Sequence, residues 1–235
     1  MARLPRLALA GRPHYVLQRG HNGSPIFVDA DDRQAYLLIL KESIAAAGIA
    51  LHAYALGDTE VRLLVTPSEA DGVGRLMQAV GRRYVAGFNR RHGRSGTLWS
   101  GRFRSTVVDD THVIDCIRHV ETHGDAASRV QVSQVPQGST SDAWTSASHH
   151  AGSRASPLIK EHPRFWTLGN TPFDREAQYR RLLAESLDPA LATAIDEAVE
   201  KGWPLGSVEF SRQLAAETAR RLHPLKAGRP RVVVR

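Results

Sequence analysis

The sequence predicts an α+β protein: a ferredoxin-like β-α-β-β-α-β domain with an antiparallel sheet, followed by a C-terminal helical extension. Strand and helix signals alternate over residues 14–124, whereas residues 158–222 carry only helical patterns. Between them, residues 125–157 hold eight serines and few large apolar side chains, which is typical of a linker. The chain therefore divides into a domain over 1–124, this linker, and an extension with a basic tail over 158–235.

Each expected element begins or ends at a recognisable signal. Asp31 and Asp32 open the first helix and Gly48 ends it, and Gly57-Asp58-Thr59 between two apolar runs indicates a β-hairpin. In the extension, Thr171-Pro172, Asp188-Pro189 and Ser207 are helix starts. The expected elements are strand 15–19, helix 31–47, strands 51–56 and 61–65, helix 72–91, strand 102–108, helix 109–123, and helices from 172 to about 186, 189 to 201 and 207 to about 222.

Composition narrows the class of protein. The chain has 235 residues with a formal net charge of +7, and a single cysteine, Cys116, excludes an internal disulfide and a multi-cysteine metal site. No stretch of about 18 apolar residues is present, so we expect no membrane-spanning helix. A reducing compartment, the cytoplasm, is the expected location.

The positive charge is concentrated in two segments that contain no acidic residue. Residues 75–104 hold eight arginines and residues 220–235 hold six basic residues, so the rest of the chain carries a net −7. Arginine predominates in both segments and suits forked binding of phosphate oxygens. A polyanion, most commonly a nucleic acid, is the expected partner. A solvated basic face with no partner is the alternative interpretation.

A long motif then points to a family. Met77-Gln78, Gly81-Arg-Arg-Tyr-Val85, Phe88-Asn89-Arg-Arg-His-Gly-Arg94, Gly96-Thr-Leu-Trp99 and Gly101-Arg-Phe-Arg-Ser105 resemble the REP-associated tyrosine transposases, a group of single-tyrosine HUH transposases. Leu63-Leu-Val-Thr-Pro67 also matches. The resemblance implies a DNA-binding protein that acts on single strands beside small hairpins, near the nucleoid, and it implies a homodimer. In this family two histidines on one strand hold a metal ion, and a helix tyrosine attacks the scissile phosphate.

The sequence departs from the family at these catalytic positions. Glu60 and Arg62 stand where the resemblance places the two histidines, and His119 stands at the place of the tyrosine. An arginine stays protonated and repels a divalent cation, and Glu60 is expected to pair with it. We therefore expect a degenerate transposase with no intact catalytic residue, no metal and no cofactor. An active transposase with unusual ligands, using Mg²⁺ or another divalent metal, is the alternative, and a protein-interaction module is a third.

The expected DNA contacts are mostly guanidinium groups, with two aromatic rings for stacking on unpaired bases. Gly228-Arg229-Pro230-Arg231 also resembles the core of an AT-hook, although a basic tail that only adds affinity is equally consistent. The expected DNA-binding residues are Arg19, Arg75, Arg82, Arg83, Arg90, Arg91, Arg94, Trp99, Arg102, Phe103, Arg104, Arg229 and Arg231.

Three further patterns have plainer interpretations. His112, Cys116, His119 and His123 share one helix face, but ligands along a straight helix cannot surround a tetrahedral zinc ion, so a semi-buried face is preferred. Tyr84 lies in an apolar stripe, which favours packing over a role as a substitute nucleophile. The helices 189–201 and 207–222 could mimic a helix-turn-helix, but their linking segment favours an ordinary helical hairpin.

Overall fold

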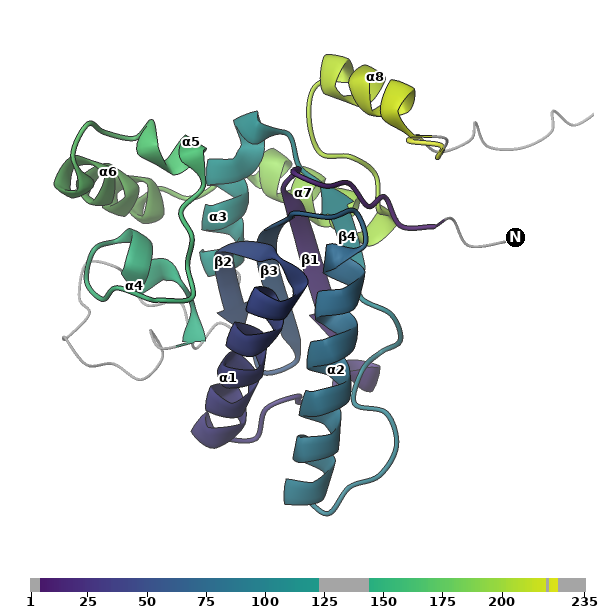
Figure 1. Ribbon diagram of the computed structural model, residues 1–235. Coiled ribbons are helices and arrows are strands. Elements are labelled where there is room, and N and C mark those ends of the chain that lie inside the picture. Colours follow the sequence, from purple (N-terminus) through teal and green to yellow (C-terminus); the bar gives the residue numbers. More distant parts are fainter. Residues whose placement is uncertain (1–4, 123–143, 219, 224–235) are drawn as a thin grey trace, which may run out of the picture.

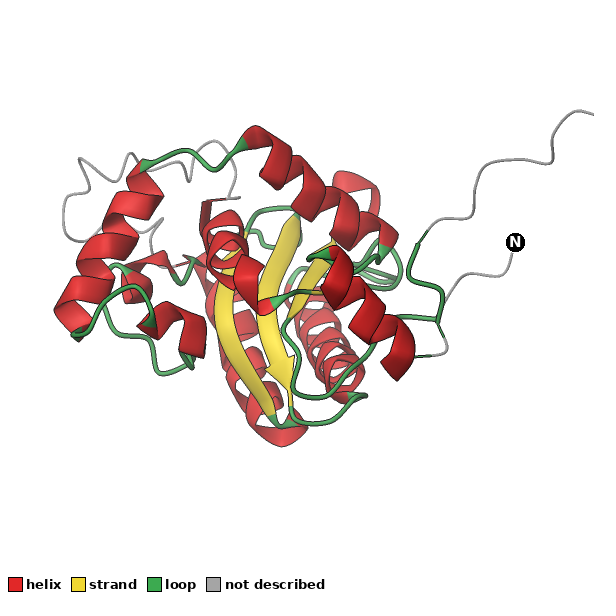
Figure 2. Ribbon diagram, turned by 90° about the horizontal axis from the view of Figure 1, so that it is seen from above, coloured by secondary structure: helices red, strands yellow, loops and turns green. Residues whose placement is uncertain are grey.

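A four-stranded antiparallel sheet lies at the centre of the computed structural model, which describes residues 5–122, 144–218 and 220–223. Its strand order is β2-β3-β1-β4, and helices cover both of its faces (Figures 1 and 2). This order, with two split β-α-β units, confirms the predicted ferredoxin-like class. The elements are β1 (His14–Arg19), η1 (His21–Gly23), α1 (Ala30–Ala47), β2 (Ile49–Leu56), β3 (Glu60–Pro67), α2 (Gly72–Arg91), β4 (Arg104–Val107), η2 (Asp110–His112), α3 (Val113–Thr122), α4 (Ala147–His150), α5 (Pro163–Trp166), α6 (Pro172–Ala184), α7 (Pro189–Lys201) and α8 (Val208–Glu217).

Alternation along the strands sends side chains to two separate cores. On β3, Val61, Leu63 and Val65 face α1 and α2, while Arg62 and Leu64 point to the opposite face. That opposite face is covered by α3 and by α7 of the extension, and both helices contribute buried apolar side chains to the second core. An arginine therefore projects into the interior between the sheet and two helices.

The helices begin and end where local chemistry dictates. The Asp29 side chain accepts a hydrogen bond from the Asp32 backbone N–H at the start of α1, and Gly48 ends that helix with φ at +64°. The bounds of α2 are those expected from the sequence. By contrast, α8 ends at Glu217 rather than near 222, because Thr218 adopts an extended conformation. Leu222 still reaches the small apolar cluster beneath α8.

The extension is fixed to the first domain by a buried carboxylate. Glu121 of α3 accepts hydrogen bonds from Tyr179 Oη (2.5 Å), His150 Nδ1 (2.6 Å) and Ser146 Oγ (2.5 Å). The donors come from α6 and from α4 with its N-cap residue, so one side chain joins α3 to two other segments. The expected linker is thus partly built into the fold from residue 144 onward, while residues 125–143 lie outside the described residues. No helix of the described chain combines the length and apolar character needed to cross a membrane.

Candidate nucleic-acid interface

A buried ionic network occupies the sheet face under α3 and α7. We call it the Arg62 network; its members are Tyr15, Glu60, Arg62, His119 and Asp196. Arg62 donates from Nε to Glu60 Oε1 (2.6 Å) and from Nη1 to Tyr15 Oη (3.1 Å) and Asp196 Oδ1 (3.0 Å). Tyr15 Oη and His119 Nδ1 are 2.9 Å apart. The three positions singled out by the family resemblance are therefore brought together in space, and the expected Glu60–Arg62 pair is present.

The proton positions in the network follow from its donors. Because Arg62 donates to the Tyr15 oxygen, the phenol hydrogen is directed to His119 Nδ1, which accepts it. The other ring nitrogen of His119, Nε2, lies 3.7 Å from Asp196 Oδ2. Hydrogen bonds thus join Arg62 to Tyr15 and Tyr15 to His119, whereas the contact between His119 Nε2 and Asp196 is longer than a hydrogen bond.

Burial and ion pairing shift the acidities of the network groups in opposite directions. Burial raises the pKa of Tyr15 above its usual value, against a smaller opposing effect of Arg62. Burial also acts to raise the pKa of Asp196 and Glu60, but their contacts with His119, Arg62 and Arg19 outweigh it and hold both pKa values below their ordinary range. Tyr15 therefore stays protonated at neutral pH while both carboxylates stay ionised.

This donor set does not fit a divalent metal ion. The carboxylates of Glu60 and Asp196 both pair with Arg62, whose side chain is 3% exposed and holds its positive charge where a cation would have to lie. Within the described parts of the chain, no group of three or more His, Cys, Asp or Glu side chains could hold a metal ion. His123, one member of the histidine–cysteine pattern, lies outside the described residues.

Helix α7 also engages two of the expected DNA-contacting arginines. Glu200 accepts a hydrogen bond from Arg19 Nη1, and its Oε2 lies 3.8 Å from Arg104 Nε. Arg19 donates from Nε to Glu60 as well (2.9 Å). The carboxylate of Glu200 therefore stands between two half-exposed guanidinium groups at the border of the Arg62 network.

Four expected contact residues are exposed and form no ion pair with another described residue. Arg82 and Arg90 lie on α2, and Arg94 and Arg102 lie in the loop that runs back beside α2 to β4 (Figure 1). The Arg94 guanidinium lies 5.5 Å from the Phe88 ring centroid, which leaves its N–H groups available. These side chains form a basic rim along one helix and its following loop.

Other expected contacts are paired at the surface. Arg75 binds Glu69 and Asp71, and Arg83 binds Glu42. Exposed ion pairs of this kind contribute roughly 0–1 kcal/mol, so a phosphate can displace the acidic partner at little cost. The pairing therefore leaves both arginines able to bind an anion.

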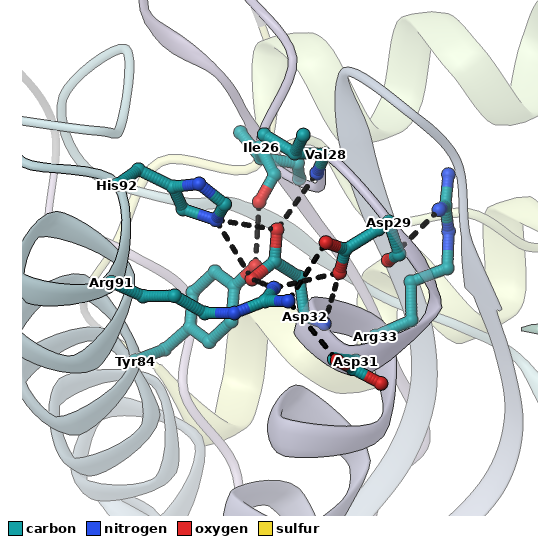
Figure 3. Close-up of polar contacts among 9 residues, drawn as sticks. All are labelled: Ile26, Val28, Asp29, Asp31, Asp32, Arg33, Tyr84, Arg91 and His92. Carbon is teal, nitrogen blue, oxygen red and sulfur yellow. Dashed lines mark hydrogen bonds and ion pairs between the residues drawn. The ribbon is translucent and has the colours of Figure 1, made fainter.

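Arg91 is held differently. Its guanidinium reaches Asp29, Asp31 and Asp32 at the start of α1, and His92 Nε2 lies 2.9 Å from Asp32 Oδ2 (Figure 3). The hydrogen bonds from Arg91 and neighbouring N–H groups lower the pKa of Asp29 to about 2. Arg91 therefore joins the end of α2 to the start of α1, and three carboxylates already share its donors.

The two aromatic candidates are partly buried against the first core. Trp99 lies beside Tyr84, with ring centroids 6.1 Å apart, and its backbone bridges to Gly20. Arg6 covers one face of the Phe103 ring at 3.7 Å and donates to the Phe103 carbonyl. Stacking of either ring on a base stays a prediction. Arg229 and Arg231 lie outside the described residues.

Comparison with known proteins places this arrangement in a structural context. No protein-family model matches the sequence, and no curated protein matches it. A solved structure of a REP-associated tyrosine transposase bound to a REP hairpin superposes with a TM-score of 0.51, over 70% of this chain and 93% of that one, at 11% identity. This chain shares its fold. A crystal structure of a protein described as a transposase, from Deinococcus radiodurans R1, matches with a TM-score of 0.36, over 54% of this chain and 98% of that one, at 20% identity.

Sequence reasoning missed the contributions of Tyr15, Asp196 and Glu200. The signal available was Arg62 itself: an arginine in an apolar strand needs buried acceptors. Nothing in the local pattern of α7 shows which acidic residue supplies them, because that depends on how the extension packs on the sheet.

Proposed function

We propose that this chain binds DNA, as a single strand or a hairpin, and does not cut or rejoin it. The proposal rests on two features that occur together in one fold. Arginines of an acid-free segment stay exposed along α2 and its loop, while the guanidinium of Arg62 lies buried on the sheet at a position where the family resemblance implies a metal ligand. The first feature attracts a polyanion, and the second opposes phosphate chemistry.

Support for DNA as the ligand comes from charge, side-chain type and fold. Exposed arginines bind phosphate oxygens through forked N–H pairs and give an affinity that falls steeply with salt. The solved transposase that shares this fold is bound to a REP hairpin. A structured strand with an unpaired flank is therefore the ligand to test first.

Support for the absence of strand transfer comes from the tyrosines. All five (Tyr15, Tyr36, Tyr54, Tyr84 and Tyr179) are buried, and burial raises the pKa of each. Tyr84 donates its hydroxyl to the Ile26 carbonyl at 2.6 Å, which fits the packing role expected of it. A covalent phosphotyrosine needs an accessible and activated hydroxyl, and none of these groups provides one.

The binding half is tested with a fluorescent hairpin carrying a single-stranded flank, titrated at several salt concentrations. The triple variant Arg82→Gln/Arg90→Gln/Arg94→Gln should weaken binding at least tenfold and flatten the dependence on salt. Arg154→Gln/Arg164→Gln/Arg181→Gln removes the same charge from exposed positions in the linker and the extension and should change affinity far less. Equal losses in both variants, or affinity indifferent to salt, would show that no such interface exists.

The chemical half is tested by incubating the protein with the same oligonucleotide, with and without Mg²⁺ or Mn²⁺. We expect neither cleaved strand nor covalent protein–DNA adduct. The variant Glu60→His/Arg62→His/His119→Tyr, assayed in parallel, restores the residue types of the family. A metal-dependent adduct from the unaltered chain would establish the active-transposase alternative instead.

A further inference from the structure

A basic cleft opens between the N-terminal segment, the start of β4 and the end of α7. Its volume is about 180 Å³, and we call it the β4–α7 cleft. The charged side chains that line it are Arg6, Arg102, Arg104, Glu200, Lys201 and Arg220. Five cations thus surround a single carboxylate. A cleft of this size and charge fits a phosphate group with several waters, each of which takes about 30 Å³ in the liquid.

Arg220 lacks a counter-charge within the described chain. Its Nε and Nη1 atoms are buried and make no hydrogen bond to a described residue, and its guanidinium lies 5.6 Å from the Trp203 ring centroid. Burial and the neighbouring Arg221 lower the pKa of Arg220. A partly buried guanidinium without a counter-charge is costly, and an anion in the cleft that Arg220 lines lowers that cost by supplying the opposite charge nearby.

The other cations of the cleft differ in how far they are already engaged. Arg6 donates to the Phe103 carbonyl, and Lys201 pairs with Glu197 at 2.6 Å. Arg102 is exposed without an ion pair among the described residues, and Arg104 has only the long contact to Glu200. Arg102, Arg104 and Arg220 are therefore the side chains with donors to offer.

Glu200 already occupies the position of an anion. Its carboxylate accepts from Arg19 and approaches Arg104, as a phosphate would, yet it belongs to α7 of the same chain. Its side chain is 34% exposed, so it is free to turn outward when a competing anion arrives. We propose that the β4–α7 cleft is a phosphate site that holds one phosphate of a bound DNA strand, with Glu200 as its intramolecular competitor. This inference rests on the proposed DNA binding.

The test compares charge changes inside the cleft with matched changes outside it. Glu200→Gln removes the competitor and should tighten hairpin binding by about twofold to fivefold, the range expected for one exposed ion pair. Arg220→Gln and Arg104→Gln should each weaken it about tenfold, as expected for loss of a charge-assisted hydrogen bond. Glu209→Gln and Arg212→Gln, an exposed pair on α8, are the controls and should change affinity less than twofold.

Inorganic pyrophosphate, followed by calorimetry on the same variants, separates failure of the cleft from failure of DNA binding. Hairpin effects of Glu200→Gln and of either arginine variant that exceed the controls support the proposal, and Arg104→Gln serves where Arg220→Gln fails to fold. If the variants change the affinity for pyrophosphate but not the affinity for the hairpin, the cleft binds free phosphates and the DNA assignment is overturned. If the cleft variants change the affinity for both ligands no more than the control variants do, the proposed site does not exist, even where the hairpin still binds through α2.

Discussion

The guanidinium of Arg62 donates to the phenolic oxygen of Tyr15 at 3.1 Å, so an arginine on β3 holds a buried hydroxyl in place. The same guanidinium bridges Glu60, its neighbour on β3, and Asp196, which comes from α7. The Arg62 side chain therefore has a structural role, because it links the sheet to the extension.

Loss of Arg62 should destabilise the fold strongly. Arg62→Met leaves Glu60 and Asp196 without their shared cation, and breaking a buried pair in this way costs about 3 kcal/mol or more. Urea unfolding at pH 7 measures the change. The double variant Glu60→Gln/Arg62→Met should lose less than the sum of the single changes, because the uncompensated charge is removed along with its partner. Strictly additive losses would show that the two side chains do not interact.

Neighbouring arginines on α2 should behave in opposite ways. Arg91→Gln should lower the midpoint of thermal unfolding with little effect on hairpin affinity, because Asp29, Asp31 and Asp32 already share the Arg91 guanidinium. Arg90→Gln should leave unfolding unchanged and reduce the slope of log K against log salt by about 0.7–0.9, the value for one lost phosphate contact. The reverse pattern would place the interface beside Arg91, where the end of α2 meets the start of α1.

Mild acid should destabilise the protein through buried neutral histidines. His52 donates from Nδ1 to the Lys160 carbonyl (2.7 Å) and accepts at Nε2 from the Thr66 hydroxyl (2.8 Å), so the neutral ring uses both nitrogens. Burial lowers the pKa of His52 from 6.5 to about 4, and burial lowers the pKa of His14 similarly.

The unfolded chain therefore binds these protons at a higher pH than the folded chain does. Stability is fully present above pH 6.5 and falls as the pH drops toward 4, by about 1.4 kcal/mol per pH unit for each histidine. Urea unfolding between pH 7.5 and 4.5 measures the slope. His52→Gln should reduce this slope by the contribution of one proton, about 1.4 kcal/mol per pH unit. An unchanged slope would rule out His52 as the source.

The carboxylate that fixes the extension offers a paired test on two tyrosines. Tyr179→Phe removes one of three donors to the buried Glu121 and should cost about 1–3 kcal/mol of unfolding free energy. Tyr36→Phe is the control, since the buried Tyr36 hydroxyl makes no hydrogen bond to a described residue and its removal should be neutral. Hydrogen exchange in α6 should rise in the first variant alone, and equal exchange in both would show that this contact does not fix the extension.

Local sequence was enough to predict the order of elements in the first domain. The bounds of α2 follow from an apolar stripe at helical spacing, and the β2–β3 hairpin follows from Gly57-Asp58-Thr59 between two apolar runs. Arg62 could be placed on β3 and paired with Glu60 because residues two apart on a strand share one face. These features depend on neighbours in the chain, so periodicity and capping chemistry reveal them.

Tertiary packing decided what the arginines contact. Nothing in the pattern of residues 75–104 separates Arg90, which forms no ion pair with a described residue, from Arg91, which binds three aspartates about 60 positions away. The partners of Arg62 and Arg104 on α7 likewise lie more than 90 positions along the chain. Charge along a sequence predicts that a polyanion is attracted. Which donors remain available depends on which acidic side chains folding brings within a few ångströms, and that is set by how α7 and α1 dock.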